Sequence, residues 1–381
     1  MSDLKQSHGV LWRMMGGERS TSAIATKKRT RAVEPRPIDE RLTPAIRRTL
    51  EAGLTRLRGR PVRIQNLRRQ FSMGSSSFPT ERLRVSLKGE KRPLLVFFKD
   101  LDPNHQMEKA RAVRPFDLEP GRRELQMYET ILSPERFGTL HLYGYRWEPE
   151  RSRFWAFFED GGRTVLHNYL DMPRWTAAAR WAARFHAATR GLPDTQTRFL
   201  PRYDAAHYRR CAERVAQLLP LLEGAEHDLV ARGLECFVER IEWLSALPPC
   251  VLHGQYFGKN ILLRRSTRGP KVVVIDWETA ALGPGTFDLV SLTAGKWTSD
   301  ERDAMRRAYC EQYEAETGRQ IDREAFLEEL AGVALYQALE WLAWWGPHRA
   351  LSRHFGNFLR ELAILLERDF GPCMGQTVEV A

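Results

Sequence analysis

The sequence lacks long apolar runs, closely spaced cysteines and the common glycine-rich phosphate loops. No segment approaches about eighteen consecutive apolar residues, so we expect no membrane-spanning helix. The five cysteines are scattered and form no Cys-x-x-Cys pair, which argues against a disulfide framework or a zinc site and favours a reducing, cytoplasmic location. Neither G-x-x-x-x-G-K-[ST] nor G-x-G-x-x-G occurs anywhere in the chain.

Positive charge is in excess, with a net charge of +11. Residues 1–37 carry eight Lys and Arg against three Asp and Glu, or +5. Their composition resembles a basic presequence, but Asp3 and Glu18 are against this, so we expect a disordered basic leader. The remaining charge favours anionic ligands mildly. No nucleic-acid-binding motif accompanies it, and we expect no nucleic-acid partner.

Residues 38–160 are predicted to form a small β-rich lobe. A helix is expected over residues 38–54, followed by three short strand-like runs separated by turn residues, as in a β-meander. Residues 118–133 have helical spacing, with Leu125, Tyr128, Ile131 and Leu132 on one face. Two further strand-like runs, residues 139–148 and 153–160, complete the lobe.

Residues 161–370 are predicted to form a larger, mainly helical lobe, followed by a flexible tail at 371–381. A strong helix is expected over residues 175–190, between Pro173 and Gly191. The helical pattern is interrupted once, at residues 249–276, where two short apolar strands flank a basic turn. Helices then resume after Pro284 and continue to about residue 369.

That interruption carries the residues with the clearest chemistry. Asp276 directly follows the apolar run VVVI, and Asn260 directly precedes ILLRR. If these runs pair as antiparallel strands, the two side chains lie close together and can share a cation between a carboxylate and an amide oxygen. We therefore expect a metal site at this hairpin, with turn capping by Asp276 as the simpler alternative.

The segments HGQYFGKN and VVVIDWETAALGPGTFDL, taken together, resemble the aminoglycoside phosphotransferase and choline kinase-like superfamily. The family pattern is H-G-D-x-x-x-x-N, then I-D-[WF]-E, a Gly/Pro turn and D-L. The resemblance implies an α+β, bilobal protein-kinase-like fold with a small N-terminal antiparallel lobe and a larger helical lobe. It also implies that Asn260 and Asp276 bind Mg²⁺, that His253 supports the loop, and that Asp288 orders it from behind.

The same resemblance assigns residues in the first lobe. Lys99 ends the apolar run PLLVFF and would contact nucleotide phosphates, and Glu124 would pair with it, with Glu129 as the alternative one turn away. Gly74, Ser75 and Ser76 would offer backbone N–H groups and hydroxyls to the phosphates. Glu159 falls in the connector between the lobes, where backbone groups would meet adenine.

Two other features of the helical lobe have a simple structural interpretation. His186 matches a helix histidine of the family, and we expect it to be a packed structural residue. Trp341, Trp344 and Trp345 lie in a segment that contributes to the acceptor site of the family. Apolar packing is the default for these rings, and stacking on an acceptor ring is the alternative.

Gln255 departs from the family pattern, which has a proton-accepting aspartate at this position. A carboxamide can orient a hydroxyl by hydrogen bonding, but it stays neutral and cannot take the proton. General-base assistance typically contributes about 10²–10⁴-fold, whereas phosphoryl transfer depends mainly on positioning and charge neutralisation. A slower kinase with Gln255 at the catalytic position therefore stays physically reasonable.

Two functions follow from the sequence. The first is an ATP- and Mg²⁺-dependent phosphotransferase that moves a γ-phosphoryl group to a hydroxyl of a small molecule, for which the basic charge favours a neutral or anionic acceptor. The alternative is a nucleotide-binding pseudokinase with a regulatory or scaffolding role. The sequence indicates neither the identity of the acceptor nor the oligomeric state.

Overall fold

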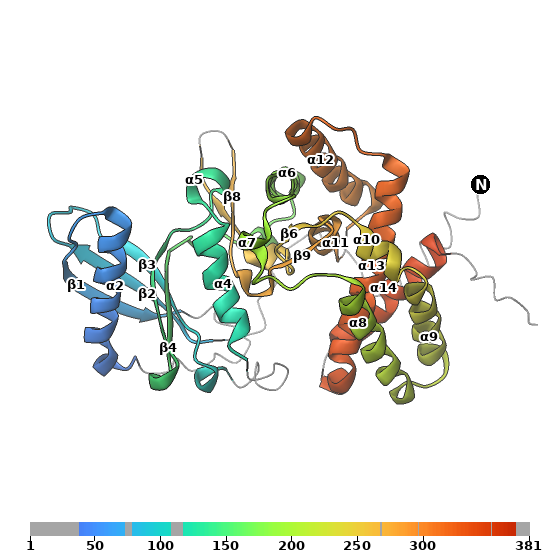
Figure 1. The fold of residues 1–381 in the computed structure, drawn as a ribbon, viewed down its shortest axis with the longest axis horizontal. Coiled ribbons are helices and arrows are strands. Elements are labelled where there is room, and N and C mark those ends of the chain that lie inside the picture. Colours follow the sequence, from blue (N-terminus) through green and yellow to red (C-terminus); the bar gives the residue numbers. More distant parts are fainter. Residues whose placement is uncertain are drawn as a thin grey trace, which may run out of the picture. The chain divides into compact units, whose positions relative to one another are not determined.

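The computed structural model describes residues 38–72, 78–107, 117–266, 269–295, 297–351 and 353–370. An antiparallel sheet forms the N-terminal part, and helices make up most of the remainder, so the expected α+β bilobal fold class is confirmed (Figure 1). Among these residues, no helix is both long enough and apolar enough to cross a membrane.

The N-terminal sheet has five antiparallel strands in the order β1-β2-β3-β5-β4, so the three-stranded meander is present. Residues 154–158 of β5 are all buried, because successive side chains of a strand point to opposite faces and both faces are covered. The strands are β1 (Ile64–Phe71), β2 (Thr80–Leu87), β3 (Leu94–Asp100), β4 (Leu142–Glu148) and β5 (Arg153–Glu159).

Helices cover the two faces of this sheet. Helix α2 (Thr43–Arg58) places Ile46 and Leu50 in one apolar cluster with Phe157 of β5. Helix α4 (Glu119–Thr130) contributes Leu125 to a second cluster, which contains Phe158. Helix α4 ends three residues before the predicted boundary, and a short helix, α5 (Pro134–Phe137), follows.

Helix α2 approaches β4 at a contact that only glycine allows. A Cβ atom added at Gly53 would lie 2.0 Å from the carbonyl oxygen of Tyr143 and 2.8 Å from Cα of Gly144. These partners are backbone atoms, which cannot rotate away as a side chain can. The glycine therefore sets the distance between the helix and the sheet.

The substitution Gly53→Ala is expected to destabilise the protein by about 2–3 kcal/mol, because overpacking against backbone outweighs the gain in helix propensity. The matched control is Gly356→Ala in helix α14, where nothing lies within 4 Å of the added Cβ. That change should stabilise the protein by about 0.5–1 kcal/mol. Urea unfolding of both variants measures the difference, and equal effects would contradict the contact.

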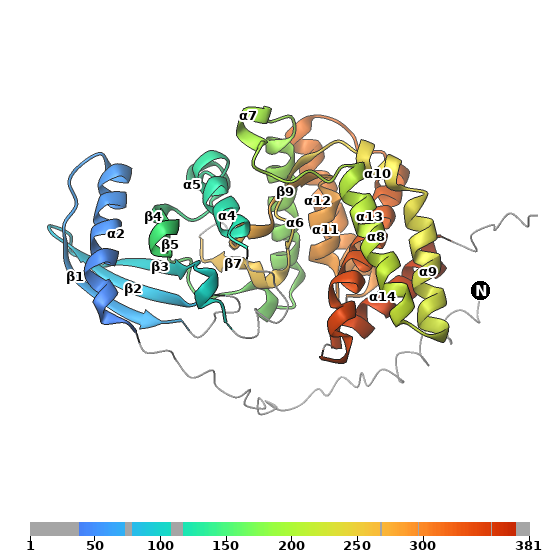
Figure 2. The same cartoon turned by 60° about the horizontal axis from the view of Figure 1, so that its bottom comes forward.

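The C-terminal part is built from helices around two apolar clusters. Helices α6 and α12 contribute to the first cluster, while α8, α9, α13 and α14 pack around the second (Figure 2). The helices are α6 (Met172–Thr189), α7 (Asp194–Thr197), α8 (Ala205–Leu218), α9 (Gly224–Val238), α10 (Ile241–Ala246), α11 (Thr286–Thr293), α12 (Ser299–Thr317), α13 (Arg323–Trp345) and α14 (Arg353–Asp369).

Four short strands interrupt these helices, where the sequence predicted two. Strands β7 (Ile261–Arg264) and β8 (Lys271–Val274) form the expected antiparallel hairpin. Strand β6 (Cys250–Leu252) pairs instead with β9 (Ala281–Gly283), which was missed because its three residues are too short to show a periodic pattern. The loop of residues 253–260 directly follows β6, and Asp276 lies between β8 and β9.

A partly buried histidine on α8 contacts Tyr336 of the cluster formed by α8, α9, α13 and α14, and burial keeps it neutral. The Nε2 atom of His207 lies 2.7 Å from the Tyr336 hydroxyl oxygen. Burial lowers the pKa of His207 to about 4, against the smaller opposing effect of Glu340. The folded protein therefore binds this proton less readily than the unfolded chain, whose histidine pKa is about 6.5.

This group should make stability fall as pH drops through the window from about 6.5 to 4. From pH 7 to pH 5 we expect a loss of about 1–2 kcal/mol, since the unfolded state gains the proton first. Urea unfolding of wild type and His207→Asn at both pH values measures it. The stability advantage of wild type over the variant should shrink at pH 5, and a constant difference would contradict a neutral His207.

Candidate functional site

Lys99, Glu124 and Asp276 meet although they come from three separate elements. Lys99 lies on β3, and its Nζ is 2.9 Å from both carboxylate oxygens of Glu124 on α4. The same Nζ lies 2.9 Å from Oδ1 of Asp276, which follows β8. The Glu124 side chain is 2% exposed, whereas that of Asp276 is 33% exposed, so the cluster opens toward solvent on the Asp276 side.

The two carboxylates of this cluster stabilise the positive charge of Lys99. Burial alone lowers the pKa of Lys99, but the carboxylates of Asp276 and Glu124 outweigh it and raise this pKa above its usual range. Burial raises the pKa of Glu124, and the ammonium of Lys99 opposes this shift. Lys99 therefore stays a fixed positive charge at the end of β3.

The hairpin brings Asn260 and Asp276 to the same edge, as expected. The backbone N–H of Ile275 donates to the carbonyl oxygen of Asn260 at 3.0 Å, directly beyond the β7–β8 pairing. Asp276 has φ 71° and ψ 59°, a left-handed conformation that is uncommon for a residue other than glycine. Such strained positions occur often in functional sites.

A buried histidine ties the loop of residues 253–260 to this hairpin. Nδ1 of His253 accepts the backbone N–H of Gln255 at 3.2 Å, so Nε2 carries the proton and donates to the carbonyl oxygen of Ile275 at 2.9 Å. Burial lowers the pKa of His253, with Asp288 opposing the shift, which fits this neutral form. The ring thus couples the loop to the residue preceding Asp276.

Asp288, on α11, lies behind the loop. Its carboxylate accepts the backbone N–H groups of His253 and Gly254 at 2.7 and 3.0 Å. It also accepts Nε2–H of His186 at 3.1 Å, while Nδ1 of His186 lies 2.9 Å from the hydroxyl oxygen of Tyr309. His186 is 1% exposed, so it is a packed residue within a buried polar chain.

Gln255 is the third residue of the loop of residues 253–260 and is half-buried. Its backbone carbonyl accepts the side-chain Nδ2–H of Asn260 at 3.0 Å. This bond commits the amide nitrogen of Asn260 and leaves the amide oxygen as its atom for a cation. One carboxylate and one amide oxygen fit Mg²⁺, which takes few protein ligands and completes its shell with water and phosphate oxygens.

A family model described as the phosphotransferase enzyme family matches residues 123–327, more than half of the sequence. The chain belongs to the phosphotransferase enzyme family. Glu124, Gln255, Asn260 and Asp276 of this phosphotransferase-family protein lie within the match, and Lys99 lies before it. Lys99 is therefore included in the candidate site because of its contacts with Glu124 and Asp276.

Solved structures show the same fold at low sequence identity. The GDP complex of a mutant aminoglycoside 2'-phosphotransferase-IIIa aligns with a TM-score of 0.55 and 14% identity, over 81% of this chain and 93% of that one. The GDP and kanamycin complex of APH(2")-IIIa gives 0.51 and 17%, over 81% and 93%. Apo APH(4)-Ia, as a thermostable mutant, gives 0.52 and 13%, over 83% and 98%. No curated protein matched this chain in sequence.

The other residues that the sequence singled out differ in their placement. Glu129 is exposed, so the alternative register of α4 is wrong and Glu124 is the partner of Lys99. Glu159 ends β5, where its Oε1 lies 2.8 Å from Nη1 of Arg264. Gly74, Ser75 and Ser76 lie outside the described residues.

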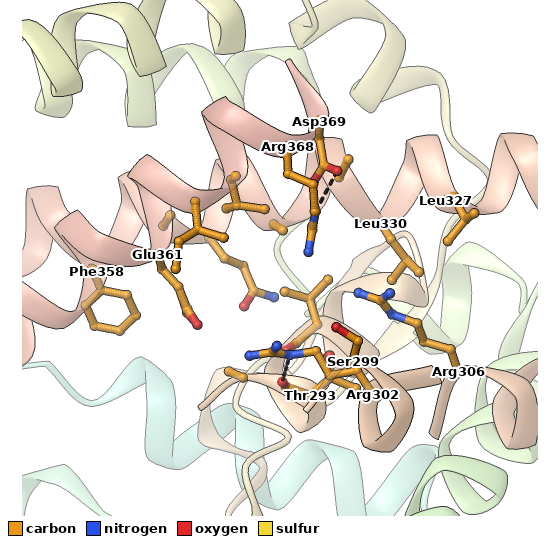
Figure 3. Close-up of a pocket in the computed structure, with 18 of the residues that line it drawn as sticks. Thr293, Ser299, Arg302, Arg306, Leu327, Leu330, Phe358, Glu361, Arg368 and Asp369 are labelled. Carbon is orange, nitrogen blue, oxygen red and sulfur yellow. Dashed lines mark hydrogen bonds and ion pairs between the residues drawn. The ribbon is translucent and has the colours of Figure 1, made fainter. Parts of the chain in front are cut away.

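A cavity of about 410 Å³ begins next to the loop and extends between α11, α12, α13 and α14 (Figure 3). Phe257, two residues after Gln255, lines it together with Trp341 on α13. Trp341 stacks on Phe358, with ring centres 5.7 Å apart, whereas Trp344 is 41% exposed. The charged side chains in the cavity lining are Arg302, Asp303, Arg306, Glu361, Arg368 and Asp369.

Two contacts near the site were not foreseen. Nη1 of Arg123, on α4, donates to the backbone carbonyl of Glu278 at 2.8 Å, which joins the helix that carries Glu124 to the segment after Asp276. Tyr309 ends the polar chain behind the loop. Neither Arg123 nor Tyr309 belongs to a recognisable motif, so no sequence signal was available for them.

Proposed function

We propose that this protein is an ATP-dependent phosphotransferase that moves a γ-phosphoryl group to a hydroxyl of a small molecule. The observation that carries the proposal is the meeting of Lys99, Glu124 and Asp276 at one point, 2.9 Å apart at their polar atoms. A fixed ammonium beside a carboxylate that can hold a metal suits nucleotide phosphates. Glu124 orients Lys99, and Lys99 contacts the phosphates.

In this proposal Asn260 and Asp276 hold Mg²⁺, which would neutralise charge on the nucleotide phosphates. The hydrogen bond from Asn260 to the Gln255 carbonyl turns its amide oxygen toward that role. His253 and Asp288 fix the loop between them through the contacts described above. Their role is to position the backbone, not to react.

Gln255 occupies the place where an acceptor hydroxyl would lose its proton. Its carboxamide can accept a hydrogen bond from that hydroxyl and orient it, but it cannot remove the proton. The transfer forms an oxygen–phosphorus bond and breaks the bond between the γ-phosphorus and ADP, so the hydroxyl proton leaves to solvent or to the transferred phosphate. We expect slow turnover for this reason.

The cavity next to Phe257 is the proposed acceptor site. Arg302 reaches the carbonyl oxygens of Thr293 and Gly295 at 3.3 and 2.8 Å, so carbonyl groups rather than a carboxylate hold it (Figure 3). Nε of Arg306 is buried with no hydrogen-bond partner among the described residues. Three arginines and three carboxylates line the cavity, so its formal charge is zero, and Arg306 is paired with Asp303 at 3.2 Å. The preference that we propose for a neutral or anionic acceptor therefore rests on the net charge of the whole chain, +11.

A nucleotide-binding pseudokinase is the second candidate, because Gln255 removes the proton acceptor while the Lys99 cluster is complete. The pseudokinase would have the same nucleotide site as the proposed phosphotransferase and would differ from it only in transferring no phosphoryl group. We place either form in the cytoplasm, since Cys211, Cys250 and Cys310 are buried and form no disulfide among the described residues.

Calorimetric titration with ATP and Mg²⁺, followed by transfer of labelled phosphate across a panel of hydroxyl compounds, tests the proposal. We expect saturable binding that requires the metal, and transfer to neutral or anionic members of the panel. Binding without transfer to any compound or to water would favour the pseudokinase. No nucleotide binding would overturn both.

A further inference from the structure

A second cavity, of about 390 Å³, lies among α5, α6 and the start of β8, and its lining is strongly basic. Arg136 comes from α5, Arg180 and Arg184 from α6, and Lys271 from the first position of β8. Glu135 is the only acidic residue that lines it, so the formal charge of the lining is +3. Lys99, Gln255, Asn260 and Asp276 do not line this cavity.

Local contacts hold these three elements together. Nε1 of Trp181, on α6, donates to the carbonyl oxygen of Phe137 in α5 at 2.8 Å. Cε of Lys271 would lie 2.8 Å from a Cβ added at Gly138, so this side chain passes over the end of α5. The guanidinium of Arg136 lies 4.9 Å from the centre of the Phe137 ring. Contacts between α5, α6 and β8 therefore hold the cavity in shape, and the rings of Phe137 and Trp181 line part of it.

Some arginines of the fold have a carboxylate as counter-charge, and the cations of this cavity do not. Arg69 is paired with Glu81 at 2.7 Å, and Arg264 with Glu159 at 2.8 Å. Among the residues that the structure describes, Arg136, Arg180, Arg184 and Lys271 form no ion pair with a carboxylate.

Arg180 and Arg184 are moreover four residues apart on α6, a spacing at which like charges repel. All four cationic side chains are exposed, so water screens this repulsion and an anion can approach them from solvent.

We propose that this cavity binds a small oligophosphate anion, at a site separate from the nucleotide site. Three guanidinium groups offer the forked pairs of N–H donors that match phosphate oxygens, and the lysine adds a point charge. Several positive charges call for a ligand with two or more phosphate groups. The volume falls within the range of pockets for small ligands, about 300–1,000 Å³.

The test is calorimetric titration of the full chain with inorganic pyrophosphate and with tripolyphosphate, at low and high salt. Wild type should bind saturably, with an affinity that falls as salt rises. The double variant Arg180→Gln/Arg184→Gln should lose affinity by roughly tenfold or more, because two charged donors are removed. The matched control, Arg209→Gln/Arg210→Gln, removes two exposed charges from α8 and should bind as wild type does.

Lys99→Met separates this site from the nucleotide site, because pyrophosphate could also contact Lys99. We expect oligophosphate binding to persist in Lys99→Met, and Mg²⁺–ATP binding to persist in the α6 double variant. Loss of pyrophosphate binding in Lys99→Met, with retention in the double variant, would overturn the proposal. So would absence of binding in wild type, or retention of a single-stranded oligonucleotide by a protein that ignores both oligophosphates.

Discussion

Phosphoryl transfer should fall by about 10²–10³-fold when Asp276 is replaced by Ala. The change removes a proposed ligand of Mg²⁺ and also one of the two carboxylates that contact Lys99. Nucleotide affinity measured in the presence of Mg²⁺ should fall with it. Calorimetric titration with ATP and Mg²⁺, with slow ATP hydrolysis followed in the same samples, measures both effects.

Two further substitutions make this result specific. Asp276→Asn keeps the shape of the side chain but not its charge, so it should also be impaired. Asp194→Ala removes an exposed aspartate of α7 that is paired with Arg202, and should leave both measurements unchanged. Wild-type activity in Asp276→Asn would mean that the carboxylate is not needed, and the proposed metal site would be wrong.

The substitution Gln255→Asp should raise the rate of transfer or hydrolysis by roughly 10²-fold, at the lower end of what a general base contributes. It places a proton acceptor at the opening of the loop while leaving the backbone contacts of residue 255 in place. Single-turnover transfer from labelled ATP measures the chemical step, and calorimetry shows whether nucleotide binding is kept.

Gln255→Ala serves as the control, because it removes both the proton acceptor and the hydrogen-bonding amide. A rate below wild type in this variant would show that glutamine orients the reacting hydroxyl. If Gln255→Asp is also slower than wild type, glutamine is part of a working mechanism and the idea that it limits the rate must be abandoned.

Short-range features were predictable from the sequence alone. The β7–β8 hairpin follows from two apolar runs separated by a basic turn, and it puts Asn260 beside Asp276 through local pairing. The separation of β5 side chains into two cores follows from the alternation of strand residues. In each case, neighbouring residues in the sequence determine the geometry.

Long-range features were not predictable in the same way. The contact between Lys99 and Asp276 joins residues 177 positions apart, so it depends on how β3 and β8 are placed by the whole fold. The cavity beside Phe257 needs four helices from the last hundred or so residues of the chain, and only the tryptophan-rich segment of α13 gave a sequence signal for it.

The residues that line the cavity beside Phe257 and the residues that hold the loop of residues 253–260 come largely from different parts of the chain. The loop of residues 253–260 is fixed by Asp288, Ile275 and its own backbone, whereas α12, α13 and α14 shape most of the cavity. Substitutions on those three helices can therefore reshape the cavity without removing a hydrogen bond that holds the loop. Under the proposed function, such a division would let the range of accepted molecules diverge during evolution while the residues proposed to contact phosphate stay under separate constraint.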